Sequence, residues 1–187
     1  MISISKKIKK EHKEIWDIVL YGSFIRGKYD SNDIDIAIIL KDKIILNDKL
    51  ELGQELKLHI SEDNKKNIDI KCVDINDLLD STFLARQGII AEGYSLIDEV
   101  FLSEKFGFKT YALFIYSLKG LTNSQKKTFY YVLKGRRRQE GISKENIEEL
   151  KPGVIKTPIS FEEEFKEILK QHNIIYETKK AMFYSFS

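Results

Sequence analysis

Residues 15–40 contain two apolar segments separated by a turn. The first segment, residues 18–20, ends at Gly22 and Ser23, and the second runs from Asp33 to Leu40. In the second segment, Asp33, Asp35, Ala37 and Ile39 alternate with Ile34, Ile36 and Ile38, as expected of a strand whose successive side chains point to opposite faces. The pattern predicts two strands joined by a tight turn and a short basic helix or loop over residues 24–28.

Asp33 and Asp35 share one face of the second predicted strand. Two carboxylates so close together repel each other and raise each other's pKa unless a cation lies between them. Mg²⁺ prefers oxygen ligands, needs only one or two carboxylates, and completes its shell with water and substrate phosphates. The adjacent Gly22 lets a phosphate approach the backbone, and amides at a following helix N-terminus would face it. These residues predict a metal site beside a phosphate site.

The two halves of this motif, in this order and between two strands, resemble the signature of the DNA polymerase beta-like nucleotidyltransferase superfamily. The matching residues are Gly22-Ser23-Phe24-Ile25-Arg26-Gly27 and then Asp33-Ile34-Asp35. One position departs from the family pattern: Asn32 stands where Ser or Gly usually precedes the first aspartate. The resemblance implies an α+β fold with a nucleotidyltransferase-type mixed sheet and flanking helices.

The resemblance also implies a third carboxylate on a neighbouring strand, for which residues 67–74 are the candidate. Their alternation puts Asp69 on the face opposite Ile68 and Ile70, whereas Asp74 lies at the strand end and is better suited to cap a following helix. We therefore expect Asp69, with Asp33 and Asp35, to be catalytic and to hold two Mg²⁺ ions, or Mn²⁺ in their place.

The nucleotide expected from this resemblance is a nucleoside triphosphate, with ATP as the first choice. Gly22 and Ser23 are expected to bind its phosphates. Arg26 and Lys28 are further candidates for triphosphate contacts, although either could be an ordinary loop charge. The reaction implied is transfer of a nucleoside monophosphate to a hydroxyl of an RNA end, a protein side chain or a small molecule, with release of pyrophosphate.

The remaining pattern predicts two domains, residues 1–107 and 108–187. In the first, helices are expected over residues 5–14, 47–59 and 75–87, with an apolar segment at 89–97 closing the domain. In the second, a small α+β domain, we expect strands at 108–118, 153–159 and 174–186, and helices at 122–133, 141–150 and 161–172. This back part resembles the C-terminal part of archaeal proteins that carry the same front domain.

The charge is unevenly distributed along the chain. The net charge is +2, but the first 107 residues are acidic overall and the rest is basic. Arg136, Arg137 and Arg138 form the densest cationic run, and with the nearby tyrosines they could bind RNA. The alternative is that these arginines end a helix and the tyrosines belong to the core.

Several classes of protein are excluded by composition. With 42% hydrophobic residues the chain can form a buried core, and no apolar run is long enough to span a membrane, so we expect a cytoplasmic protein. The single cysteine excludes an internal disulfide, and the three histidines lack ligand spacing for zinc.

An alternative function is a non-catalytic partner protein on the same fold, such as a toxin–antitoxin component.

Overall fold

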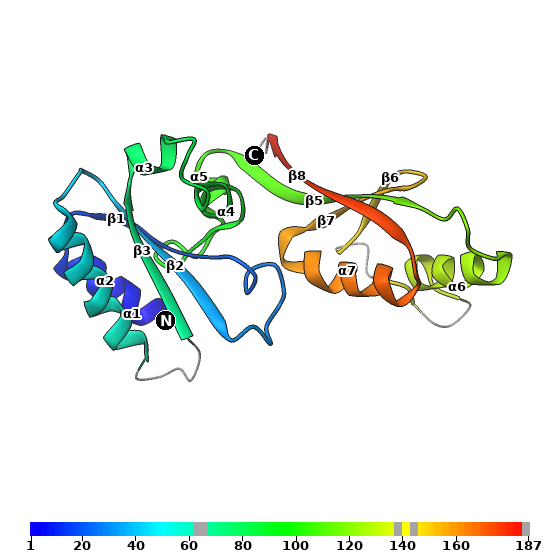
Figure 1. The fold of residues 1–187 in the computed structure, drawn as a ribbon, viewed down its shortest axis with the longest axis horizontal. Helices are drawn as coiled ribbons and strands as arrows, with labels where there is room; N and C mark the ends of the chain where they lie inside the picture. The colour runs from blue at the N-terminus through cyan, green and yellow to red at the C-terminus, as the bar shows by residue number, and fades with distance from the viewer. Residues whose placement is uncertain (62–66, 137–139, 143–145, 185–187) are drawn as a thin grey trace. The chain divides into compact units, whose positions relative to one another are not determined.

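A computed structural model describes residues 1–61, 67–136, 140–142 and 146–184. The chain divides into two compact units, Met1–Lys109 with the C-terminal end from Tyr184, and Thr110–Phe183. Each unit contains a four-stranded sheet, and the two sheets are separate (Figure 1). None of the helices in the described ranges is long and apolar enough to cross a membrane.

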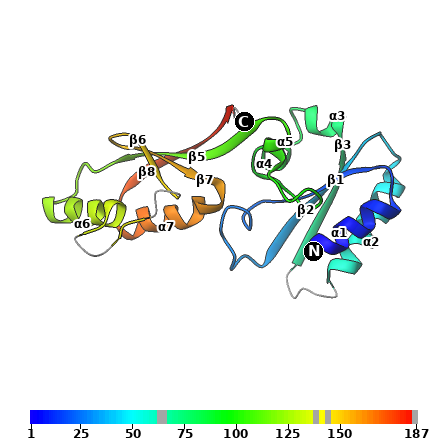
Figure 2. The same ribbon diagram turned by 180° about the vertical axis from the view of Figure 1, so that it is seen from behind.

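The sheet of the first unit has the strand order β3-β2-β1-β4. Strand β1 (Ile15–Tyr21) is antiparallel to β2 (Asp33–Leu40) and to the short β4 (Tyr94–Ser95). Strand β3 (Asn67–Asp74) is parallel to β2 and lies at the edge. The sheet is therefore mixed, with helices on both faces (Figures 1 and 2), which confirms the predicted fold class.

Each face of this sheet has its own apolar core. Three isoleucines of β2 (Ile34, Ile36 and Ile38) pack with helices α1 (Ile2–Glu11) and α2 (Leu46–Ser61) through residues such as Ile8 and Leu56. On the other face, Ala37 and Ile39 pack with Val73 and with helices α3 (Ile75–Leu79), α4 (Arg86–Glu92) and α5 (Leu102–Lys105). The alternation predicted for β2 and β3 is confirmed, and it leaves the Asp33 and Asp35 positions on the α3–α5 face.

One predicted helix of this unit, at residues 75–87, is wrong in extent. The segment forms α3 (Ile75–Leu79) and, after a turn, α4 (Arg86–Glu92), followed by the small α5 (Leu102–Lys105). The Asp80 carboxylate accepts hydrogen bonds from the backbone and hydroxyl of Thr82, which stabilises the turn at the expense of helix. The break lets α4 return over β1.

The second unit is a small α+β structure with sheet order β6-β7-β5-β8. Its elements are β5 (Phe108–Ser117), α6 (Asn123–Lys134), β6 (Glu148–Lys151), β7 (Val154–Pro158), a 3₁₀ turn η1 (Ile159–Phe161), α7 (Glu162–Gln171) and β8 (Ile175–Tyr184). Phe114, Phe129 and Phe165 are fully buried between the sheet and the helices.

The helix predicted at residues 141–150 is wrong in its described part. Residues 148–151 form β6, which pairs antiparallel with β7. Pro152 and Gly153 connect the two strands, and Gly153 has a positive φ of 83°. A Pro-Gly pair between two strand-forming segments is a turn signal, so the hairpin was readable in the sequence.

Candidate active site

The turn after β1 is built around Gly22. Its φ is +81°, and an added Cβ would lie 2.1 Å from Oδ2 of Asp35. A glycine is therefore required both by the backbone conformation and by the carboxylate that lies against it. The turn brings its backbone directly to the carboxylate of β2.

Residues 24–28, for which we expected a helix or a loop, form turns. The amide of Lys28 donates to the carbonyl of Ser23 (3.1 Å), and that of Gly27 donates to the carbonyl of Phe24 (3.2 Å). There is thus no helix N-terminus behind Gly22 to bind an anion. The Ser23 hydroxyl donates to the hydroxyl of Ser31 (3.2 Å), which in turn donates to the carbonyl of Asp33. The turn is tied to the start of β2.

The parallel pairing of β2 and β3 brings the third carboxylate next to the other two. Asp35 is the direct register partner of Asp69, and Asp33 is the partner of Asn67. The Asn67 amide donates to Oδ1 of Asp33 (3.1 Å), and Lys71 donates to Oδ2 of Asp69 (2.7 Å). All three sequence candidates therefore lie at one end of one sheet face, with Lys71 among them.

Asp35 is the electrostatic centre of this group. Its pKa is raised, chiefly by burial and then by the charge of Asp69, whereas Lys71 and Arg26 act in the opposite direction. Asp33 contributes a smaller increase in the same pKa. An additional cation would stabilise the ionised form of a carboxylate in such surroundings.

Arg26 is held by a buried acid. Its Nη1 lies 2.9 Å from Oε2 of Glu92, whose side chain is only 5% exposed. Glu92 lies at the end of α4, and nothing in the local sequence around either residue predicts this pairing. Arg26 is thus fixed near Asp35, while Lys28 is exposed on the loop.

Tyr21 is a residue of this site that the sequence analysis missed. It is the register partner of Asp35 on β1, and its hydroxyl is buried without a hydrogen-bond partner among the described residues. Burial, followed by the charges of Asp35 and Asp69, raises its pKa well above the ordinary value. The period of two along β1 could have placed Tyr21 on the face of Asp35 once the pairing was known.

Asp74 has the structural role that was expected of it. Its carboxylate accepts from the amides of Asn76 and Asp77 at the start of α3, and it is 3.1 Å from Nζ of Lys49. Burial opposes ionisation, but these bonds lower its pKa overall. Asp74 is thus a helix cap with a lysine partner.

The remaining predicted residues lie in the second unit. Arg136 is exposed just after α6, with Cζ 5.0 Å from the ring centre of Tyr131. Arg137 and Arg138 lie outside the described residues. Tyr130 and Tyr131 are 58% and 39% exposed, so the alternative that they belong to the core is wrong.

Comparison with protein families gives a clear result for the first unit. The family model described as "Polymerase beta, Nucleotidyltransferase" matches residues 4–99, which is half of the chain and includes the Gly22 turn and all three carboxylates. The chain belongs to the polymerase beta nucleotidyltransferase family, as its motif predicted. No curated protein matches it significantly by sequence.

Solved structures similar to this chain include toxin–antitoxin complexes. One, a toxin–antitoxin with AMP-PNP, is 22% identical over 56% of this chain and 83% of that chain, with a TM-score of 0.40. A mutant of the MntA–HpeT complex is 20% identical, covering 57% and 84%, with a TM-score of 0.39. A third is the tri-AMPylated Shewanella oneidensis HEPN toxin with MNT antitoxin, at 24% identity, covering 57% and 84%, with a TM-score of 0.35.

Proposed function

We propose that the first unit is a metal-dependent nucleotidyltransferase that moves a nucleoside monophosphate from a nucleoside triphosphate, with ATP as the expected donor, to a hydroxyl acceptor. The observation that carries this proposal is the contact between the positive-φ Gly22 and the Asp35 carboxylate, directly beside Asp69. A binding scaffold has no need to gather three acids beside a glycine turn, whereas a metal–triphosphate site uses both.

The donor set suits magnesium. Asp33, Asp35 and Asp69 offer only carboxylate oxygens, the ligands that Mg²⁺ prefers. Within the described ranges, no group of three or more Asp, Glu, His or Cys side chains is arranged so that it could hold a metal ion by itself. The proposed ion is therefore one that needs only one or two carboxylates and takes its other ligands from water and phosphates. Asp33 and Asp35 would hold one ion, and Asp69 with Asp35 a second.

The metal ions would supply charge for the triphosphate and a lowered pKa for the acceptor hydroxyl. The protein's own residues position the reactants. The Gly22 turn would present its backbone to a phosphate, and the Ser23 hydroxyl, which donates to Ser31 in this structure, would rotate to donate to that phosphate. Arg26, fixed by Glu92, adds a positive charge near Asp35.

In the reaction, the acceptor oxygen attacks the α-phosphorus in line with the leaving group. A new P–O bond forms as the bond to the β-phosphate oxygen breaks, and pyrophosphate leaves while the acceptor proton passes to solvent or to a carboxylate. The chemistry depends on positioning and charge, so no histidine base is needed.

The direct test is incubation of the protein with each α-labelled nucleoside triphosphate, Mg²⁺ and a cell lysate, followed by separation of RNA, protein and small molecules. We expect one class to become labelled, and labelling to vanish with the Asp33→Asn, Asp35→Asn double variant. Omitting the lysate controls for self-labelling.

The same experiment separates the proposal from a non-catalytic partner role. A partner protein would transfer no label with any triphosphate and would instead form a stoichiometric complex with another macromolecule from the lysate. Label that is transferred equally by the double variant would also contradict the assignment, because the carboxylates would then be dispensable.

A further inference from the structure

The second unit contains a groove with no role in the proposed reaction. It has a volume of about 610 Å³ and lies between α6 and the strands β5 and β6–β7. Its floor is apolar: Phe129 and Leu133 of α6 are buried, and the Phe129 ring packs edge-on against Tyr116 of β5 at 5.6 Å. This volume is in the range of pockets that bind a small organic group.

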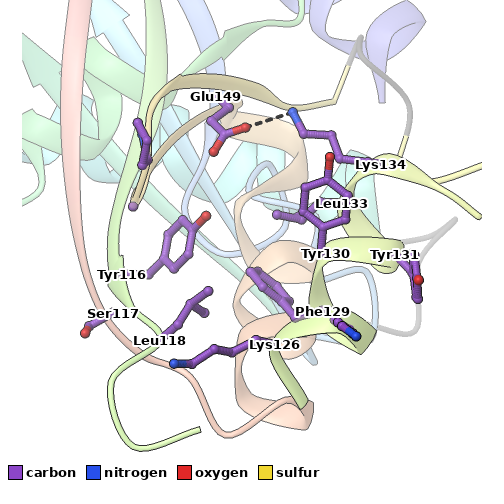
Figure 3. A pocket seen from close by; sticks show the side chains of 13 residues that line it. Tyr116, Ser117, Leu118, Lys126, Phe129, Tyr130, Tyr131, Leu133, Lys134 and Glu149 are labelled. Atoms are coloured by element: carbon purple, nitrogen blue, oxygen red, sulfur yellow. Dashed lines mark ion pairs between the residues drawn. The ribbon is translucent and has the colours of Figure 1, made fainter. Parts of the chain in front are cut away.

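Tyrosine rings line the groove from both sides. Tyr116 projects from β5 and Tyr130 from α6, as Figure 3 shows. Tyr130 is 58% exposed, so most of its ring is available to a ligand. Next to it, Tyr131 already carries the guanidinium of Arg136 at 5.0 Å from the ring centre. Exposed rings of this kind form platforms on which planar groups stack.

The charges along the groove are mostly of one sign. Lys126, Lys127 and Lys134 lie along α6, and Glu149, the one acid among the described lining residues, is paired with Lys134 at 2.8 Å. Lys126 precedes Tyr130 by four residues, and Lys127 precedes Tyr131 by four. Residues four apart in a helix lie on the same face, one turn from each other. The groove therefore carries lysine charges within one helical turn of its tyrosines.

We propose that this groove binds a single-stranded nucleic acid, with a base stacked on Tyr130 and the flanking phosphates on Lys126 and Lys127. A duplex is a poor match, because its bases are already stacked and cannot enter a pocket between two tyrosines. The proposal is independent of the nucleotidyltransferase activity, since none of its residues belongs to the first unit.

The test is fluorescence anisotropy with a short labelled single-stranded RNA and the full chain, at several salt concentrations. In the Lys126→Ala, Lys127→Ala variant we expect weaker binding and a salt slope smaller by about 1.4, because each phosphate contact on a single strand contributes about 0.7. The matched control is Lys7→Ala with Lys10→Ala, two exposed lysines of α1 in the first unit. That control removes the same charge and should leave the slope unchanged.

The stacking part has its own pair of variants. Tyr130→Ala should bind the RNA about fivefold to hundredfold more weakly, whereas Tyr130→Phe should bind within about twofold of the wild type because it keeps the ring. Tyr130 is exposed, so both variants should fold, as circular dichroism can verify.

Four results would overturn the proposal. These are no binding by the wild type at low salt, an equal loss in the two double-lysine variants, wild-type affinity of Tyr130→Ala, and binding of the matching duplex or of polyglutamate as tightly as the single strand. The last result would assign the groove to polyanions in general or to an acidic protein partner.

Discussion

Replacing Gly22 by alanine tests the packing at the heart of the site. The alanine Cβ would lie 2.1 Å from Oδ2 of Asp35, whereas ordinary contact begins near 3.4 Å, so the carboxylate must retreat by more than 1 Å. The positive φ adds about 1–2 kcal/mol of backbone strain, and the forced contact adds about 1–3 kcal/mol. We expect the free energy of unfolding to fall by about 2–5 kcal/mol. Because a misplacement of about 1 Å can cost about a hundredfold in rate, nucleotidyl transfer should fall at least that far.

Gly107 provides a matched control for this variant. Its φ of +79° is nearly the same, but an added Cβ would meet nothing within 4 Å. Gly107→Ala should therefore lose only the backbone contribution of about 1–2 kcal/mol and keep its transfer rate. Urea unfolding and the labelling assay measure both quantities. If Gly22→Ala matched Gly107→Ala in stability and in rate, the close contact between the turn and Asp35 would be refuted.

Three further predictions concern single side chains of the first unit. Asp35→Asn should be more stable than the wild type at pH 7, because the wild type loses stability as the pH rises from the ordinary pKa of 3.8 through the raised folded-state pKa of Asp35. Urea titrations should show this difference in stability vanish below pH 3.8, and a variant less stable than the wild type at pH 7 would contradict the raised pKa. Asp69→Asn should abolish nucleotidyl transfer at little cost in stability, whereas Asp74→Ala should lower the free energy of unfolding by about 1–2 kcal/mol, through the lost helix cap, and keep its transfer rate. The reverse outcome would exchange the roles of these two residues. Tyr21→Phe should keep or slightly raise stability, because the described residues offer its hydroxyl no hydrogen-bond partner. A loss above about 1 kcal/mol in urea unfolding would reveal a hydrogen bond.

Much of the site was predictable because it depends on local periodicity. The alternation along residues 33–40 put Asp33 and Asp35 on one face, and the same rule separated Asp69 from Ile68 and Ile70. What periodicity cannot give is the register between strands. Sequence alone did not fix Asp35 opposite Asp69, and this pairing required the parallel alignment of β2 and β3.

The features that were missed depend on contacts between distant residues or on competing local bonds. Arg26 and Glu92 are far apart in the sequence and carry no shared motif, so their ion pair emerges only from the packing of α4. The break between α3 and α4 arises because the Asp80 side chain competes for backbone hydrogen bonds. The hairpin of β6 and β7 was missed because a charged segment rich in glutamate has helical composition, although its Pro-Gly turn indicated strands.

The most direct measurement of the central claim is calorimetric titration of a non-hydrolysable ATP analogue, with and without Mg²⁺, into the wild type and into the Asp33→Asn, Asp35→Asn variant. The matched control is Asp42→Asn with Asp48→Asn, two exposed acids outside the site. We expect Mg²⁺-dependent binding in the wild type and in the control, and none in the Asp33 and Asp35 variant despite an intact fold. Unchanged binding in that variant would contradict the assignment of these carboxylates as the metal and triphosphate site.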